Sequence, residues 1–78
     1  MARSDRKPAS VHTVPNREGG WDNKQGGKTI HHEDTKSEAA AAGREAAKRD
    51  RTEHVIHNRD GRISGSDSYG HDPFPPRG

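Results

Sequence analysis

The chain has 78 residues, of which 33% are charged and only 23% are hydrophobic. A chain of this length can form one small domain with a limited core. The absence of cysteine excludes disulfides and thiolate metal sites. A formal net charge of +2 creates no strong positive field. The scarcity of large aliphatic residues favours self-association as a source of further buried area.

The N-terminal segment 1–10 is basic and polar, and it lacks the apolar stretch of a secretory signal. We expect it to be a flexible arm. No apolar run approaches the roughly 20 residues that a membrane-spanning helix needs. The expected compartment is therefore the cytoplasm.

Three short strands are predicted in the first half of the chain. The segment 11–14 is β-prone and ends at Pro15, which has no N–H for a strand ladder. Glycine pairs then mark turns before two further strands, 21–24 and 28–32. The second of these strands contains Asp and Asn, so its β-propensity depends on Trp21.

A helix is predicted over 35–51, since Thr35 and Glu38 have the spacing of a capping box. Its apolar face consists of small residues, namely Ala39, Ala40, Gly43, Ala46 and Ala47. Gly43 costs about 1 kcal/mol relative to Ala in a helix, which fits either a close contact or a tolerated glycine. The larger side chains available to fill the space opposite this face are Trp21, Ile30, Val55, Ile56 and Ile63. We expect Trp21 to pack there with Ile30 and with Val55 or Ile56.

After the helix, 53–57 is a strand and the Asp-Gly pair in 58–61 predicts a tight turn. A short edge strand follows at 62–64, and a Pro-rich extended tail occupies 65–78. The element order β-β-β-α-β-β predicts an α+β fold, with a small antiparallel sheet packed on one helix in a domain spanning 11–64.

Six segments of the chain together resemble DUF2188, a family of short bacterial proteins of unknown function. These segments are VHTVPN (11–16), GGW (19–21), DTKSEA (34–39), GRE (43–45), HVIHNRDGRI (54–63) and DSYGHDPFPP (67–76). The resemblance covers residues 11–76 and implies a folded bacterial domain. It implies no reaction, ligand or partner, because the family has none assigned.

The six histidines do not predict a metal site. His31 and His32 are adjacent and His54 and His57 are three residues apart, so on strands each pair points to opposite faces. A combination of His32, Glu33 and His54 across strands is conceivable, but surface or cross-strand histidine is the better interpretation. No nucleophile motif and no phosphate-binding loop is present. We therefore predict no enzyme activity and no cofactor.

Binding is the remaining class of function, and the leading hypothesis is a module that binds a protein partner or a second copy of itself. The tail could supply the contact, either by docking on a folded body or as an extended Pro-rich ligand. Its docking residues would be Tyr69, Pro73, Phe74 and Pro75. The alternative is weak, sequence-independent nucleic-acid binding, with contacts from Lys24, Lys28, Arg44, Lys48, Arg49 and Arg51.

Overall fold

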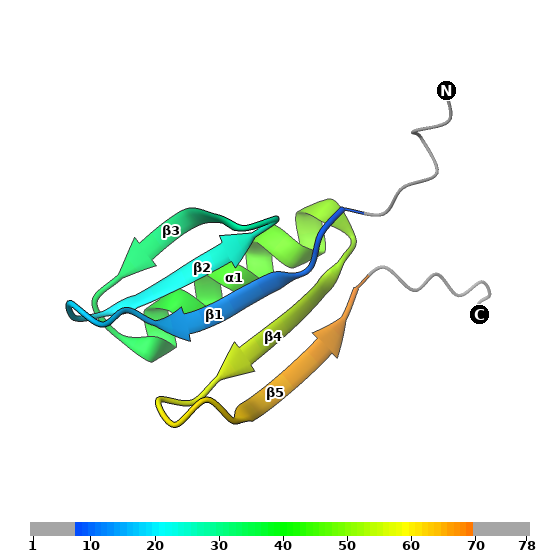
Figure 1. Cartoon of the computed structure of the whole chain (residues 1–78). Helices are drawn as coiled ribbons and strands as arrows, with labels where there is room; N and C mark the ends of the chain where they lie inside the picture. Colours follow the sequence, from blue (N-terminus) through cyan, green and yellow to red (C-terminus); the bar gives the residue numbers. More distant parts are fainter. Residues whose placement is uncertain (1–7, 70–78) are drawn as a thin grey trace.

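One helix packs against one face of a five-stranded sheet (Figure 1), in a computed structural model that describes residues 8–69. The helix is α1 (Lys36–Asp50). The strands are β1 (Val11–Pro15), β2 (Trp21–Gln25), β3 (Lys28–Glu33), β4 (Glu53–His57) and β5 (Ile63–Ser68). The α+β class and the predicted element order are confirmed.

The sheet has the order β3-β2-β1-β4-β5 and is mixed rather than wholly antiparallel. The pair of β1 and β4 is parallel, and the other three pairs are antiparallel. The reason is the helical crossover. Two hairpins make β3 parallel to β1, and a strand that follows a crossover helix returns in the direction of the strand before it. The helix therefore carries β4 back over the sheet to lie parallel to β1.

The N-terminal end of the helix is capped as predicted, and a further cap closes its C-terminal end. The Thr35 hydroxyl accepts a hydrogen bond of 3.1 Å from the Glu38 amide, and it donates to the Glu38 carboxylate at 3.2 Å. At the other end Arg51 has a left-handed backbone with φ of 54°, and its N–H reaches the carbonyls of Ala47 and Lys48. These bonds satisfy groups that a helix end would otherwise leave without partners.

The last strand extends further than the sequence predicted. The strand expected at 62–64 continues to Ser68, so the sheet includes part of the segment that was assigned to the tail. Tyr69 follows, and its N–H donates to the Thr52 carbonyl at 3.1 Å. The Thr52 hydroxyl in turn donates to the Pro8 carbonyl at 2.9 Å. Both ends of the described segment therefore meet at Thr52.

The apolar core is small and lies between α1 and the sheet. Val11, Ala46 and Ala47 are its buried centre, and Ile30 and Tyr69 pack against it. Trp21 is also buried, as predicted, with 6% of its surface exposed. Of the alternatives Val55 and Ile56, Val55 alternates with the inward-facing His54 and so faces away from α1, whereas Ile56 is the Cα partner of the buried Thr13 and lies on the helix side. Ile63, a further candidate for this space, is 61% exposed and does not fill it.

Candidate functional site

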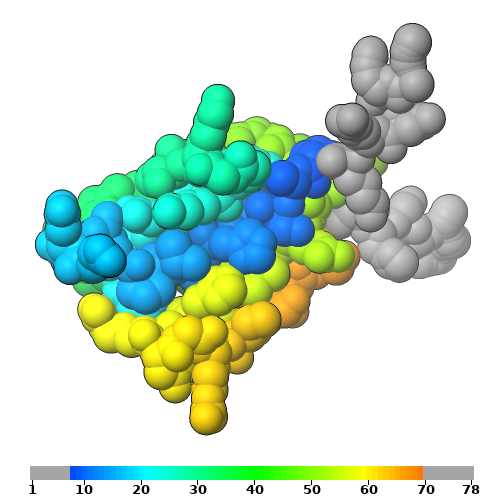
Figure 2. All heavy atoms as spheres, viewed as in Figure 1, coloured from blue at the N-terminus to red at the C-terminus, as the bar shows by residue number. Residues whose placement is uncertain are grey.

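The sheet face away from α1, here called the open face, has no second layer over it within residues 8–69 (Figure 2). The strand pairings place the residues of this face. Val14 of β1 lies opposite Asp22 of β2, and His57 of β4 lies opposite Ile63 of β5. His12 and Val55 are Cα partners on β1 and β4. We define the central cluster of this face as His12, Val14, Val55, His57 and Ile63.

Two histidines lie in contact at the middle of the central cluster. Nδ1 of His12 is 3.0 Å from Nε2 of His57, and the ring centroids are 5.3 Å apart. Burial lowers the pKa of His57, and the nearby His12 lowers it further. The two rings therefore share one hydrogen bond, in which one imidazole N–H donates and the other nitrogen accepts.

A polar group borders the central cluster on the β2–β3 side. The Asp22 carboxylate accepts hydrogen bonds from Asn16 Nδ2 at 2.9 Å and lies 2.7 Å from His32 Nδ1. Asp22 is 7% exposed, whereas Lys24 on the same strand is exposed. The border of the open face is thus charged or hydrogen-bonded, while its centre carries no carboxylate or ammonium group.

A second polar group is buried on the opposite face, beneath α1. The Thr13 hydroxyl donates to Asn23 Oδ1 at 2.5 Å and lies 2.8 Å from His54 Nε2. The Asn23 amide donates to the Ala39 carbonyl at 2.8 Å. Because a hydroxyl has only one proton to donate, His54 must donate from Nε2 to Thr13. The cluster therefore joins four elements: its hydrogen bonds connect β1, β2 and β4 to one another and β2 to the helix.

The position of His54 favours one charge state as well as one tautomer. Its Nδ1 is buried and has no hydrogen-bond partner among the described residues. Burial lowers the pKa of His54 below its ordinary value, the charge of Arg44 lowers it further, and Asp67 opposes these effects. The neutral ring is thus the form that suits this site. With all its other polar atoms used internally, the buried cluster is structural and offers no group to a ligand.

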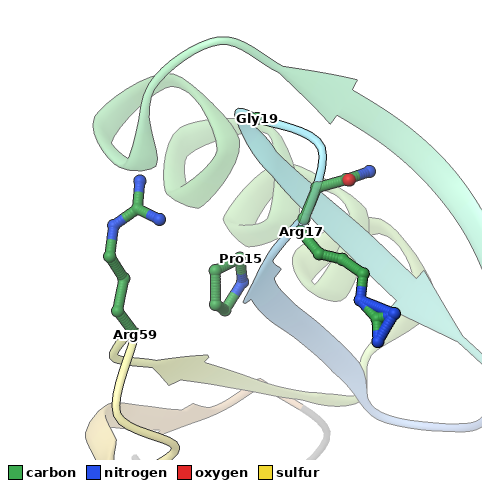
Figure 3. A pocket seen from close by; sticks show the side chains of 5 residues that line it. Pro15, Arg17, Gly19 and Arg59 are labelled. Atoms are coloured by element: carbon green, nitrogen blue, oxygen red, sulfur yellow. The ribbon is translucent and has the colours of Figure 1, made fainter.

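A third feature lies at the end of the sheet where two hairpins meet. A shallow pocket there is lined by Pro15, Asn16, Arg17, Gly19 and Arg59. Figure 3 shows the guanidinium groups of Arg17 and Arg59 pointing away from each other on either side of Pro15. They do not converge on a common ligand position.

Arg59 instead stacks on Trp21, with its guanidinium carbon 5.2 Å from the ring centre. Lys36 Nζ lies 5.4 Å from the same ring and donates to Asn58 Oδ1 at 2.7 Å. Trp21 is therefore enclosed by cations and is not a free stacking surface for a base.

The residues proposed for nucleic-acid contact do not form one surface. Lys24 is on the open face, whereas Arg44, Lys48 and Arg49 belong to α1 in the other layer and Arg51 caps its end. Lys48 lies 3.9 Å from Glu45, and Arg49 lies 3.4 Å from Asp50. Lys28 begins the edge strand β3. These cations are dispersed over two faces and partly neutralised.

Of the proposed docking residues, Tyr69 lies half-buried against the core of its own chain. Pro73, Phe74 and Pro75 lie outside the described residues. The docking hypothesis for the tail therefore stays a prediction.

No three His, Cys, Asp or Glu side chains come close enough to hold a metal ion within the described part of the chain. The conceivable combination of His32 with His54 does not form, because His54 is under α1 and His32 bonds Asp22 on the open face. Sequence reasoning compared neighbouring histidines and missed the contact between His12 and His57, which are 45 residues apart. The sequence contains one weak signal for this contact: both histidines lie in predicted strands, 11–14 and 53–57, at positions whose side chains can face the same side of a sheet.

The described residues include no helix that is long and apolar enough to cross a membrane. No curated protein and no solved structure matches the chain. The model of an uncharacterised family conserved in bacteria, DUF2188, matches residues 11–69, which include every strand and the helix. The chain therefore belongs to the DUF2188 family.

Proposed function

We propose that this chain is a non-enzymatic interaction module that binds a second copy of itself, or failing that another protein, through the open face of its sheet. The observation that carries the proposal is the composition of that face. Its centre presents three β-branched aliphatic residues and two imidazoles, and no part of residues 8–69 forms a layer above them. In a sheet with one solvated face, apolar and polar residues alternate along each strand, and the polar side chains face the water.

The small core supports the same proposal. Besides Trp21, its buried apolar residues are one valine and three alanines, which leaves little apolar area to offset the entropy of folding. A second layer over Val14, Val55 and Ile63 would add buried area at about 25 cal/mol per Å². A domain of this size can gain this buried apolar area by binding another chain.

A second copy is favoured over other partners by charge. The central cluster carries no formal charge when its histidines are neutral, so two copies can approach without like-charge repulsion. Nucleic acid is disfavoured, because the cations that would contact phosphates are divided between two layers. If nucleic acid bound nonetheless, its affinity would fall steeply and linearly on a logarithmic salt scale.

The test is the molecular mass in solution as a function of concentration, measured by sedimentation on a tag-free chain. We expect dimerisation that is abolished by Val55→Glu, since this change places a carboxylate at the centre of the open face. Ala41→Glu is the matched control, because Ala41 is exposed on the helix in the other layer. Its dimerisation should equal that of the unmodified chain.

A chain that stays monomeric up to roughly 1 mM would overturn self-association. Capture experiments would then compare how much of a protein partner the Val55→Glu and Ala41→Glu variants each retain. Capture that is equal for both variants would overturn the open face as the binding surface.

A further inference from the structure

The pair formed by His12 and His57 has a geometry that suits a shared metal ion as well as a shared proton. Two nitrogens bound to Zn²⁺ at about 2.0–2.1 Å in a tetrahedron lie roughly 3.3 Å apart. The observed separation of Nδ1 of His12 and Nε2 of His57 is 3.0 Å. A small outward rotation of the rings would direct both lone pairs at one point above the sheet.

The surroundings of the pair permit that rotation. Both side chains are only half-buried, and they belong to adjacent strands whose backbone pairing fixes the distance between them. No other part of the described chain lies over the open face. The backbone positions of the two histidines are thus fixed by the sheet, while their rings have room to rotate.

Two ligands from one chain do not complete a zinc site, which takes four donors. No third His, Cys, Asp or Glu joins the pair among residues 8–69. When two copies pair through their open faces, the partner's pair would supply two further imidazoles opposite the first two. Stacked sheets lie about 10 Å apart, a gap that side chains from both faces fill together.

We propose that His12 and His57 form half of a four-histidine site for a divalent transition metal such as Zn²⁺, completed by the same pair of a second copy. This inference rests on the proposed self-association through the open face, and it adds a regulator of that association. Binding requires the ring that donates the shared hydrogen bond to move its proton to its other nitrogen, so that both neutral rings offer a lone pair to the metal.

The experiment titrates Zn²⁺ into the tag-free, metal-stripped chain and follows stoichiometry by calorimetry and mass by sedimentation. We expect one Zn²⁺ per two chains and a shift toward the dimer. His12→Asn and His57→Asn should each weaken Zn²⁺ binding by about 100-fold or more, since even loss of a group that only orients a ligand costs about 10–100-fold. His31→Asn is the matched control, because His31 is an exposed histidine on the edge strand β3, and it should bind Zn²⁺ normally.

A measurement on the unmodified chain guards against variants that fail to fold. The ring signals of His12 and His57 in the NMR spectrum should shift together on adding Zn²⁺, while that of His54 stays in place. Shifts that favour His31 or His32 would overturn the inference.

The two proposals can fail separately. A chain that dimerises but ignores Zn²⁺ would overturn the metal site and leave self-association standing. A chain that binds one Zn²⁺ per monomer would overturn the shared site, and its mass as a function of concentration without metal would still decide self-association.

Discussion

Gly43 of α1 lies directly against the ring of His54 in β4. A Cβ atom added to Gly43 would come within 2.6 Å of His54 Nε2, and as close to Asn23 Oδ1. Thr13 Oγ1 would be 2.9 Å away. The helix thus makes a close approach to the sheet over its buried polar cluster, which accounts for a glycine in the middle of an alanine-rich helix.

The first prediction is that Gly43→Ala destabilises the fold, although alanine is the better helix former. The new methyl group would press on three buried side chains that are hydrogen-bonded to one another and cannot move independently. We expect a loss of roughly 1–3 kcal/mol in the free energy of unfolding, measured with urea. As a control, Ala41→Gly at an exposed helical position should cost about 1 kcal/mol. A Gly43→Ala chain more stable than the unmodified one would contradict the close contact.

The second prediction concerns the hydroxyl of Thr13. Thr13→Val preserves shape but leaves His54 Nε2–H and Asn23 Oδ1 buried without this partner. We expect a cost of about 1–3 kcal/mol in the free energy of unfolding. Thr29→Val, at an exposed position of β3, should change it by less than about 0.5 kcal/mol. Equal effects of the two substitutions would show that the buried cluster is not fully desolvated.

The third prediction follows from the lowered pKa of His54. The unfolded chain binds this proton near the ordinary histidine pKa of about 6.5, and the folded chain binds it only at lower pH. Between these two pKa values the unfolded state carries more protons, so stability decreases as the pH falls. We therefore expect the free energy of unfolding to be maintained above pH 6.5 and to fall progressively below it.

An NMR titration measures this effect directly. The His54 ring should remain neutral at a pH just below about 6.5, at which a histidine side chain of the unfolded chain is already mostly protonated. Protonation of His54 at or above the ordinary histidine pKa of about 6.5 would contradict the prediction.

The fourth prediction concerns Trp21, which is buried between the sheet and two cationic side chains. Trp21→Ala should cost on the order of 3–5 kcal/mol, enough to unfold a domain this small. Ser37→Ala, at an exposed position of α1 outside the central cluster, should change the free energy of unfolding by less than about 0.5 kcal/mol. Far-UV circular dichroism distinguishes the outcomes. A native Trp21→Ala spectrum with unchanged stability would assign Trp21 to the surface.

Local signals in the sequence were sufficient for the order and type of the elements. The Thr35 cap, the alanine run and the glycine pairs each act over a few residues, and the helix and turns appear where these residues predict them. The length of β5 was missed because Ser66 to Ser68 have little intrinsic β-propensity. These residues become a strand through hydrogen bonds to β4, an effect that only the paired structure contains.

The candidate site depends on pairings that the sequence does not encode locally. Which of two adjacent residues faces the helix is decided by the register of the sheet, and a shift of one residue would exchange the faces. In β4 the buried position is taken by His54 and the open face receives Val55, contrary to hydrophobic preference. The reason is the buried hydrogen bond to Thr13, whose partner is 41 residues away.

Both ends of the described segment meet at Thr52, so residues 8–69 begin and end at one place in the fold. A chain that enters beside Pro8 leaves beside Tyr69, at the same end of the sheet (Figure 1). A segment with adjacent ends can be inserted into a surface loop of an unrelated protein without separating the two ends of that loop. It can also be circularly permuted by joining its ends with a short linker. New termini opened in the exposed turn at Asp60 and Gly61 would leave every strand and the helix intact.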